Sequence, residues 1–126
     1  MNDIFYLTNT DVSLEDIENL ISLKFSFSTL LSRDGKAMQL SITESRKIQF
    51  IYLDIKKDFG DAEDIATISK FKIKTCLCIS HNKNELKRIL GIIKLVMDRC
   101  GGLLGSDEEG FHPLYDKNNI EQFTYN

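Results

Sequence analysis

The strongest structural pattern in the chain is an amphipathic segment at residues 82–100. Its apolar side chains recur every three or four residues, which places them on one face of a helix, and basic residues occupy much of the other face. Asn82 or Asn84 can cap the start of this helix. Gly101-Gly102 can end it, because glycine adopts the left-handed conformation common after a helix. The apolar residues are Leu86, Ile89, Leu90, Ile93, Val96 or Met97, and Cys100.

A second amphipathic segment, residues 14–24, lies near the start of the chain. Ser13 can cap it, and Asp16 lies three residues later, where a capping box places an acidic side chain. The two segments predict two helices, each with an apolar face that has to be covered by another layer.

Elsewhere the apolar residues form short runs that predict strands. Asp34-Gly35 separates two such runs and predicts a hairpin. The acidic stretch at residues 56–69 is interpreted as a loop with a short strand or turn around residues 65–68. The predicted strands lie at residues 3–9, on both sides of Asp34-Gly35, at 46–55, at 71–80 and at 103–104.

The predicted order is strand, helix, three or four strands, helix, strand. An antiparallel sheet of about five strands with two amphipathic helices on one face is an α+β fold, and a ferredoxin-like arrangement enlarged by the hairpin connects it most simply. No linker is visible in the 126 residues, and the one proline is Pro113. We therefore expect one domain over residues 1–126, with the part from about residue 111 as a tail that can lie at its periphery.

Composition excludes several classes of protein. A net charge of −3, from 16 basic and 19 acidic side chains, excludes a generally basic nucleic-acid binder. No apolar run approaches the roughly 20 residues of a membrane helix, and the acidic start is not a signal peptide. Three cysteines, an odd number, argue against a disulfide framework. We expect a cytoplasmic protein with no membrane contact.

No motif for catalysis or cofactor binding is present. Cys76, Cys78 and His81 form C-x-C-x-x-H, but structural zinc sites space their cysteines two to four residues apart and need four ligands. The two thiols are expected in the core, because side chains two apart on a strand share a face. We therefore predict no metal, no cofactor and no enzymatic activity.

Charge is distributed unevenly along the chain. Residues 1–18 carry five acidic side chains and no basic one, residues 54–64 carry five against two lysines, and residues 106–116 carry four against none. Residues 70–99 instead carry eight basic side chains against two acidic ones. The small net charge therefore conceals separate acidic and basic regions, which can also be ordinary solvated faces.

The acidic segments predict a surface that complements a basic protein, because such complementarity speeds association and gives specificity. Aromatic residues lie among the acids, and exposed aromatics are typical interface anchors, although a tail aromatic can equally fold back onto the core. The candidate partner-binding residues are Asp58, Phe59, Asp61, Glu63, Asp64, Asp107, Glu108, Glu109, Phe111 and Tyr115.

Two other functions fit the same charges. The basic helix could bind RNA or an acidic protein, but its Lys and Arg residues lack the interleaved aromatics on which bases stack, which makes nucleic acid the weaker alternative. A small regulatory or adaptor domain, able to form a homodimer through a sheet edge, is the other.

The chain resembles small bacterial immunity proteins encoded beside polymorphic toxins, including those of contact-dependent growth inhibition systems. The resemblance rests on the Ile-Phe-Tyr-Leu strand at residues 4–7, the capped acidic helix, and the end of the long helix at residues 98–107. In that stretch Asp-Arg-Cys-Gly-Gly precedes Leu-Leu-Gly-Ser-Asp. The resemblance implies a cytosolic protein that binds one cognate toxin domain, such as a basic nuclease, and blocks its active site or its access to substrate.

Overall fold

The long amphipathic segment forms helix α3, Leu86–Cys100, in the computed structural model, which describes residues 2–125. A 3-10 turn, η1 (Lys83–Glu85), precedes it, with Asn82 at the N-cap of that turn. Gly101, with φ of 70°, ends the helix as predicted. Helix α1, Leu14–Lys24, also has the predicted bounds. Its capping box is confirmed, because Ser13 and Asp16 exchange two hydrogen bonds of 3.0 Å.

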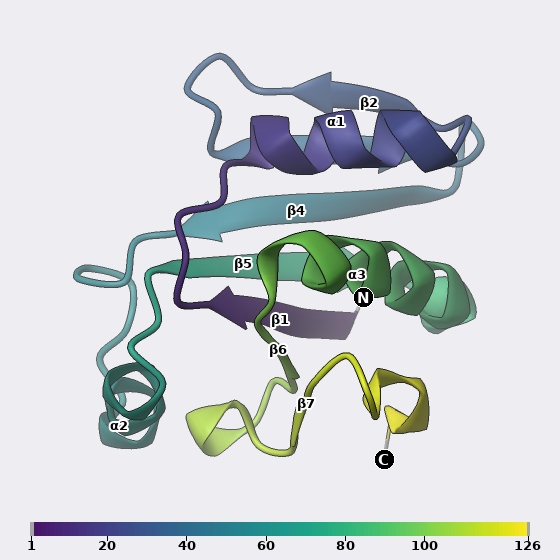
Figure 1. Cartoon of the computed structure of the whole chain (residues 1–126). Helices are drawn as coiled ribbons and strands as arrows, with labels where there is room; N and C mark the ends of the chain where they lie inside the picture. Colours follow the sequence, from purple (N-terminus) through teal and green to yellow (C-terminus); the bar gives the residue numbers. More distant parts are fainter. Residues whose placement is uncertain (1, 126) are drawn as a thin grey trace.

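Within residues 2–125, seven strands rather than the predicted five or so form one antiparallel sheet, in the order β2-β3-β4-β5-β1-β6-β7 (Figure 1). In chain order, β1, α1, β4, β5, α3 and β6 follow the β-α-β-β-α-β pattern of the ferredoxin-like arrangement, and the four strands are neighbours in the sheet in the order β4-β5-β1-β6. The hairpin around Asp34-Gly35 adds β2 and β3 to one side of these four strands, and β7 extends the other side. The strands are β1 (Asn2–Thr8), β2 (Ser28–Leu31), β3 (Ala37–Ser41), β4 (Lys47–Leu53), β5 (Thr75–His81), β6 (Leu103–Gly105) and β7 (Leu114–Tyr115).

Helices α1 and α3 cover one face of the sheet, which confirms the predicted α+β class (Figure 1). The strands alternate, so that Ile4 and Tyr6 of β1 and Leu77 and Ile79 of β5 are fully buried beneath these helices. Their neighbours in the sequence point to the opposite face.

A third helix, α2 (Ala62–Lys70), lies where we predicted a loop. It packs over the opposite face of the sheet, where a second apolar cluster forms around residues of β1 and β5. The strand predicted from residue 71 begins only at Thr75, because the chain turns after α2 through Lys72, whose φ is 54°. The members of the second cluster are Leu7, Ile68, Ile73, Cys76 and Phe111.

The end of the chain contributes two buried side chains to the core, although most of its residues are exposed or half-buried. This part of the chain contains β7 and two 3-10 turns, η2 (Glu109–Phe111) and η3 (Ile120–Gln122). Strand β7 pairs with the sheet, η2 contacts α2, and η3 contacts α3. Ile120 and Phe123 are 1% and 4% exposed and belong to the main core. The tail aromatic Phe123 therefore folds back onto the core, which is one of the two alternatives that the sequence left open.

Candidate functional site

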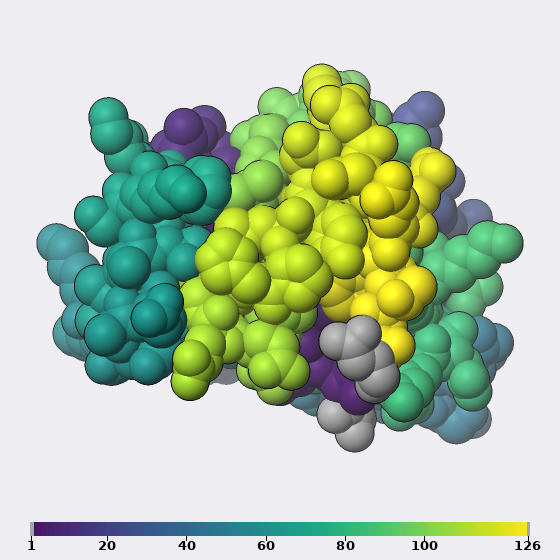
Figure 2. All heavy atoms as spheres, turned by 90° about the horizontal axis from the view of Figure 1, so that it is seen from below, coloured from purple at the N-terminus to yellow at the C-terminus, as the bar shows by residue number. Residues whose placement is uncertain are grey.

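Two of the three acidic segments meet at the contact between α2 and η2. The backbone N–H of Gly110 donates to the Asp64 carboxylate at 2.8 Å, and the Thr67 hydroxyl donates to the Gly110 carbonyl at 2.9 Å. These two bonds tie together segments more than 40 residues apart in the sequence. In Figure 2, the teal atoms of α2 lie beside the lime atoms of the segment that contains η2.

The structure separates the predicted contact residues into exposed and structural ones. Asp58, Asp61, Glu63, Asp107, Glu108 and Glu109 are exposed, whereas Asp64 is half-buried. Phe111 is only 2% exposed, so the prediction that it anchors a partner was wrong. Its ring packs edge-on against Phe5 and Phe59, at centroid distances of 5.2 and 5.6 Å. Phe111 and half-buried Phe59 therefore support the acidic surface from below.

A carboxylate that sequence reasoning did not select, Asp3 of β1, joins this surface. Its side chain accepts a hydrogen bond of 2.5 Å from the Ser80 hydroxyl, on the sheet face that α2 partly covers. Asp107 is exposed, but partial desolvation by its neighbours raises its pKa, and the negative charges of Asp3, Glu108 and Asp64 raise it further. Three carboxylates thus act on Asp107, and none of the four is in an ion pair within residues 2–125.

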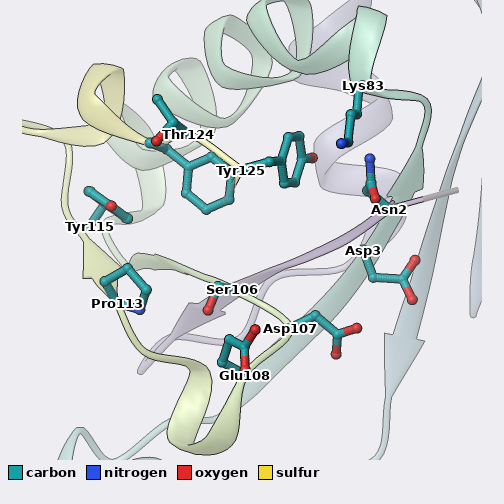
Figure 3. A pocket seen from close by; sticks show the side chains of 11 residues that line it. Asn2, Asp3, Lys83, Ser106, Asp107, Glu108, Pro113, Tyr115, Thr124 and Tyr125 are labelled. Atoms are coloured by element: carbon teal, nitrogen blue, oxygen red, sulfur yellow. The ribbon is translucent and has the colours of Figure 1, made fainter.

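A cleft of about 290 Å³ opens beside these carboxylates (Figure 3). Asp3, Asp107 and Glu108 line one side of it. Tyr115, from the predicted set, and Tyr125 line the other side together with Phe123 and Pro113, and Lys83 stands at its upper edge. We call this the acidic cleft. Carboxylates beside aromatic rings favour a cationic ligand, because the charge attracts it and the ring faces can stack on it.

The aromatic wall of the acidic cleft is fixed by a buried histidine. Phe123 contacts Tyr115 and Tyr125 edge-on, at centroid distances of 5.5 and 5.4 Å. The Tyr125 hydroxyl bonds to Nε2 of His81, whose Nδ1 lies 3.2 Å from the Ile79 carbonyl. Nδ1 therefore carries the proton of the neutral ring and donates to the carbonyl, while Nε2 accepts from Tyr125.

Acidification is expected to destabilise the protein through His81. Burial lowers the pKa of this ring below its ordinary 6.5, and the side chain is 0% exposed. The unfolded chain therefore binds a proton first, and the free energy of unfolding falls as the pH drops below about 6.5, by at most about 1.4 kcal/mol per pH unit. Above that pH the contribution is complete. Chemical denaturation of the wild type and of His81→Gln between about pH 7.5 and 5.5 measures it.

The control for this experiment is His112→Gln, because His112 is exposed. That variant should keep the wild-type pH dependence, whereas His81→Gln should flatten it. If the free energy of unfolding changed equally with pH in all three proteins, His81 could not be buried and neutral in the folded state.

The cysteines and His81 do not converge. Cys76 and Cys78 lie on the α2 side of β5, whereas His81 lies on the side of α1 and α3, because residues of opposite parity on a strand face opposite ways. Burial raises the pKa of the Cys78 thiol to about 11 and raises that of Cys76 further. Both thiols are therefore protonated and poorly nucleophilic at neutral pH. Over residues 2–125, no group of three or more candidate ligands could hold a metal ion.

Comparison with known proteins identifies no relative. No protein-family model, curated protein or solved structure matches the chain. Among the helices in the described part of the chain, none combines the length and the apolar character that crossing a bilayer requires.

Proposed function

We propose that this chain is a protein-binding domain of the immunity type, which neutralises a toxin domain by binding a basic surface on it with the acidic cleft. The observation that carries the proposal is the group of carboxylates at Asp3, Asp64, Asp107 and Glu108. Three of them, together with partial desolvation, raise the pKa of Asp107, and none of the four forms an ion pair in the described part of the chain. Such a group is unfavourable in the free protein. A cationic partner relieves the repulsion, and that relief adds to the affinity.

The shape of the cleft supports a protein partner. Its volume of about 290 Å³ lies at the lower end of the range for small-molecule pockets, which suits one long side chain such as Lys or Arg. Tyr115 and Tyr125 can flank the stem and the charge of that side chain. The exposed acids at the start of α2, Asp61 at its N-cap and Glu63 in its first turn, enlarge the negative field around the cleft and would steer the partner towards it.

The toxin in this proposal comes from the resemblance of the sequence to immunity proteins. The resulting functional class is a non-enzymatic inhibitor that acts in the cytosol, where its three free thiols stay reduced. Its bound form would cover the active site of a basic nuclease or the surface where that nuclease receives its substrate.

Co-expression with the toxin domain tests this function directly. The domain to use is the variable C-terminal region of a large secreted protein encoded next to this gene. Cells should survive when both are expressed and die when the toxin domain is expressed alone. Death in the presence of this protein, or a metabolic operon around the gene, would refute the immunity proposal.

Neutralising the cleft should slow association with that domain. Asp107→Asn combined with Glu108→Gln removes two charges with little change of shape, and both side chains are exposed. We expect the association rate constant to fall about tenfold at low salt and the difference to shrink as salt is added. Stopped-flow or surface-plasmon measurements across salt concentrations check this.

The matched control is Glu15→Gln combined with Asp98→Asn. It removes the same charge from exposed positions on α1 and α3, away from the acidic cleft. An equal loss of rate in both double variants would mean that net charge alone is responsible, and would exclude the cleft as the contact.

The edge of the sheet favours a second candidate, a regulatory or adaptor domain that forms a homodimer. Strand β2 is an edge strand, and its Leu30 is 69% exposed. Two β2 edges can pair and extend the sheet across two copies. Sedimentation of the purified chain over a range of concentrations distinguishes this dimer from a monomer that acts through the cleft.

A further inference from the structure

At the start of α3 a buried acid holds two arginines. Glu85 is 2% exposed. It accepts hydrogen bonds from Nε and Nη2 of Arg46, the first at 2.9 Å, and from Nη1 of Arg88 at 3.1 Å. Burial alone would raise the pKa of Glu85, but these bonds hold it below the ordinary value, so the carboxylate is charged. One negative charge thus fixes two guanidinium groups and leaves the cluster with a net positive charge.

Aromatic rings lie beside these cations. Phe25, which follows α1, and Phe27 stack at a centroid distance of 5.4 Å with 10° between their planes. The Arg88 guanidinium lies 5.5 Å from the centre of the Phe27 ring. The basic helix has no aromatic residues of its own at this place, and the fold supplies them from a segment about 60 residues earlier.

An open groove runs over this cluster, between the end of α1 and the start of α3, which lie on the same face of the sheet (Figure 1). Its volume is about 450 Å³. The groove passes over Gly91, where no atom lies within 4 Å of the position that a Cβ would occupy. Its lining residues are Phe25, Arg46, Asn84, Lys87, Arg88 and Gly91.

Gly91 lowers the stability of α3 relative to alanine at the same position. It lies in the middle of α3, where glycine is less favourable than alanine because the unfolded chain has more conformations to lose. Gly91 lies in no turn and does not have a positive φ, so the backbone does not require a glycine there. The effect of the missing side chain is the open space in the groove.

We propose that this groove binds a single strand of nucleic acid, with phosphates on Arg46, Arg88 and Lys87 and a base stacked on the exposed part of Phe25. Cations along a groove together with an aromatic platform are the features by which proteins hold single strands without reading a sequence. The open shape of the groove suits a continuous strand better than a free nucleotide, because a nucleotide-binding pocket would enclose its ligand more fully. An acidic peptide would use the cations but not the ring.

Fluorescence anisotropy with a labelled oligo-uridine tests the proposal on the whole protein. Three phosphate contacts predict a slope of about −2 in a plot of log affinity against log salt concentration. Lys87 is exposed and forms no ion pair with any residue from 2 to 125, and Lys87→Gln should make that slope shallower, from about −2 to about −1.4. Arg99→Gln removes the same charge from the exposed far end of α3 and should leave binding unchanged.

Gly91→Ala separates the groove from the charges. It should raise the melting temperature by a few degrees, because it improves the helix, while it weakens oligo-uridine binding severalfold by narrowing the groove. Absence of salt-dependent binding, an equal loss in Lys87→Gln and Arg99→Gln, or unchanged binding by a stabilised Gly91→Ala would each overturn the proposal. Equal competition by a poly-glutamate peptide would overturn it in favour of an acidic protein ligand.

Discussion

Gly102→Ala should destabilise the protein by about 2–6 kcal/mol, a large part of the 5–15 kcal/mol that holds a domain of this kind folded. Two costs add. Gly102 has φ of +100°, a conformation that costs a residue with a side chain about 1–3 kcal/mol. Its Cβ would also lie 2.6 Å from the Leu7 carbonyl oxygen and 2.8 Å from the Tyr6 ring, and overpacking of this kind costs about 1–3 kcal/mol.

The close approach arises because the end of α3 is bonded to β1. The Tyr6 hydroxyl donates to the Gly101 carbonyl at 2.6 Å, and the hydroxyls of Thr8 and Thr10 donate to the Cys100 carbonyl at 3.1 and 3.2 Å. Carbonyls at a helix end have no partner within the helix, so these side chains satisfy them. The chain then crosses β1 at Gly102 and enters β6, which pairs with β1.

Two other glycines separate the two costs. Gly101 has φ of +70° but nothing within 4 Å of its Cβ position, so Gly101→Ala should cost only the backbone strain, about 1–3 kcal/mol. Gly60 has neither feature, and Gly60→Ala should lie within about 0.5 kcal/mol of the wild type. Urea denaturation ranks the three variants. A Gly102→Ala variant no less stable than Gly101→Ala would contradict the packing of Gly102 on β1.

The local signals in the sequence were sufficient for most of the fold. The capping box at Ser13, the turn at Asp34-Gly35 and the period of α3 each depend on residues within a few positions of one another, and each feature is present. Helix α2 was missed because only Thr67 and Ile68 in it are buried, and they pack on residues that are distant in sequence. A signal was available: Asp61, Glu63 and Asp64 place acids at the cap and first turn of a helix.

The candidate site was also predictable only where it depends on residues close together in the sequence. The acids of residues 54–64 and 106–116 were visible in the sequence, but their meeting depends on the bonds of Gly110 to α2. Asp3 could not be selected, because only the strand order brings β1 beside β6 and the segment that follows it. Likewise, the sequence of α3 contains no aromatic residue beside its basic ones. The fold brings Phe25 and Phe27, which follow α1, beside Arg88 of α3.

Ile93→Ala should cost about 2–5 kcal/mol of stability without impairing the acidic cleft. Ile93 is 0% exposed on the face of α3 that packs on the sheet, so truncation leaves a cavity between the two layers. The periodic pattern in the sequence also predicts Ile93 on this face. Leu90 is half-buried at the margin of the face, so its truncation should cost less stability.

Leu23→Ala is the matched control for Ile93→Ala, because Leu23 is a helical residue of α1 that is 73% exposed. It should change the free energy of unfolding by no more than about 0.5 kcal/mol. Denaturation midpoints at constant slope give both values. If Ile93→Ala were as stable as Leu23→Ala, the packing of α3 on the sheet would be wrong. If Ile93→Ala were less stable but bound the toxin domain at the wild-type rate while folded, the cavity at Ile93 would leave the acidic cleft intact, even though Phe123 of that cleft belongs to the same core.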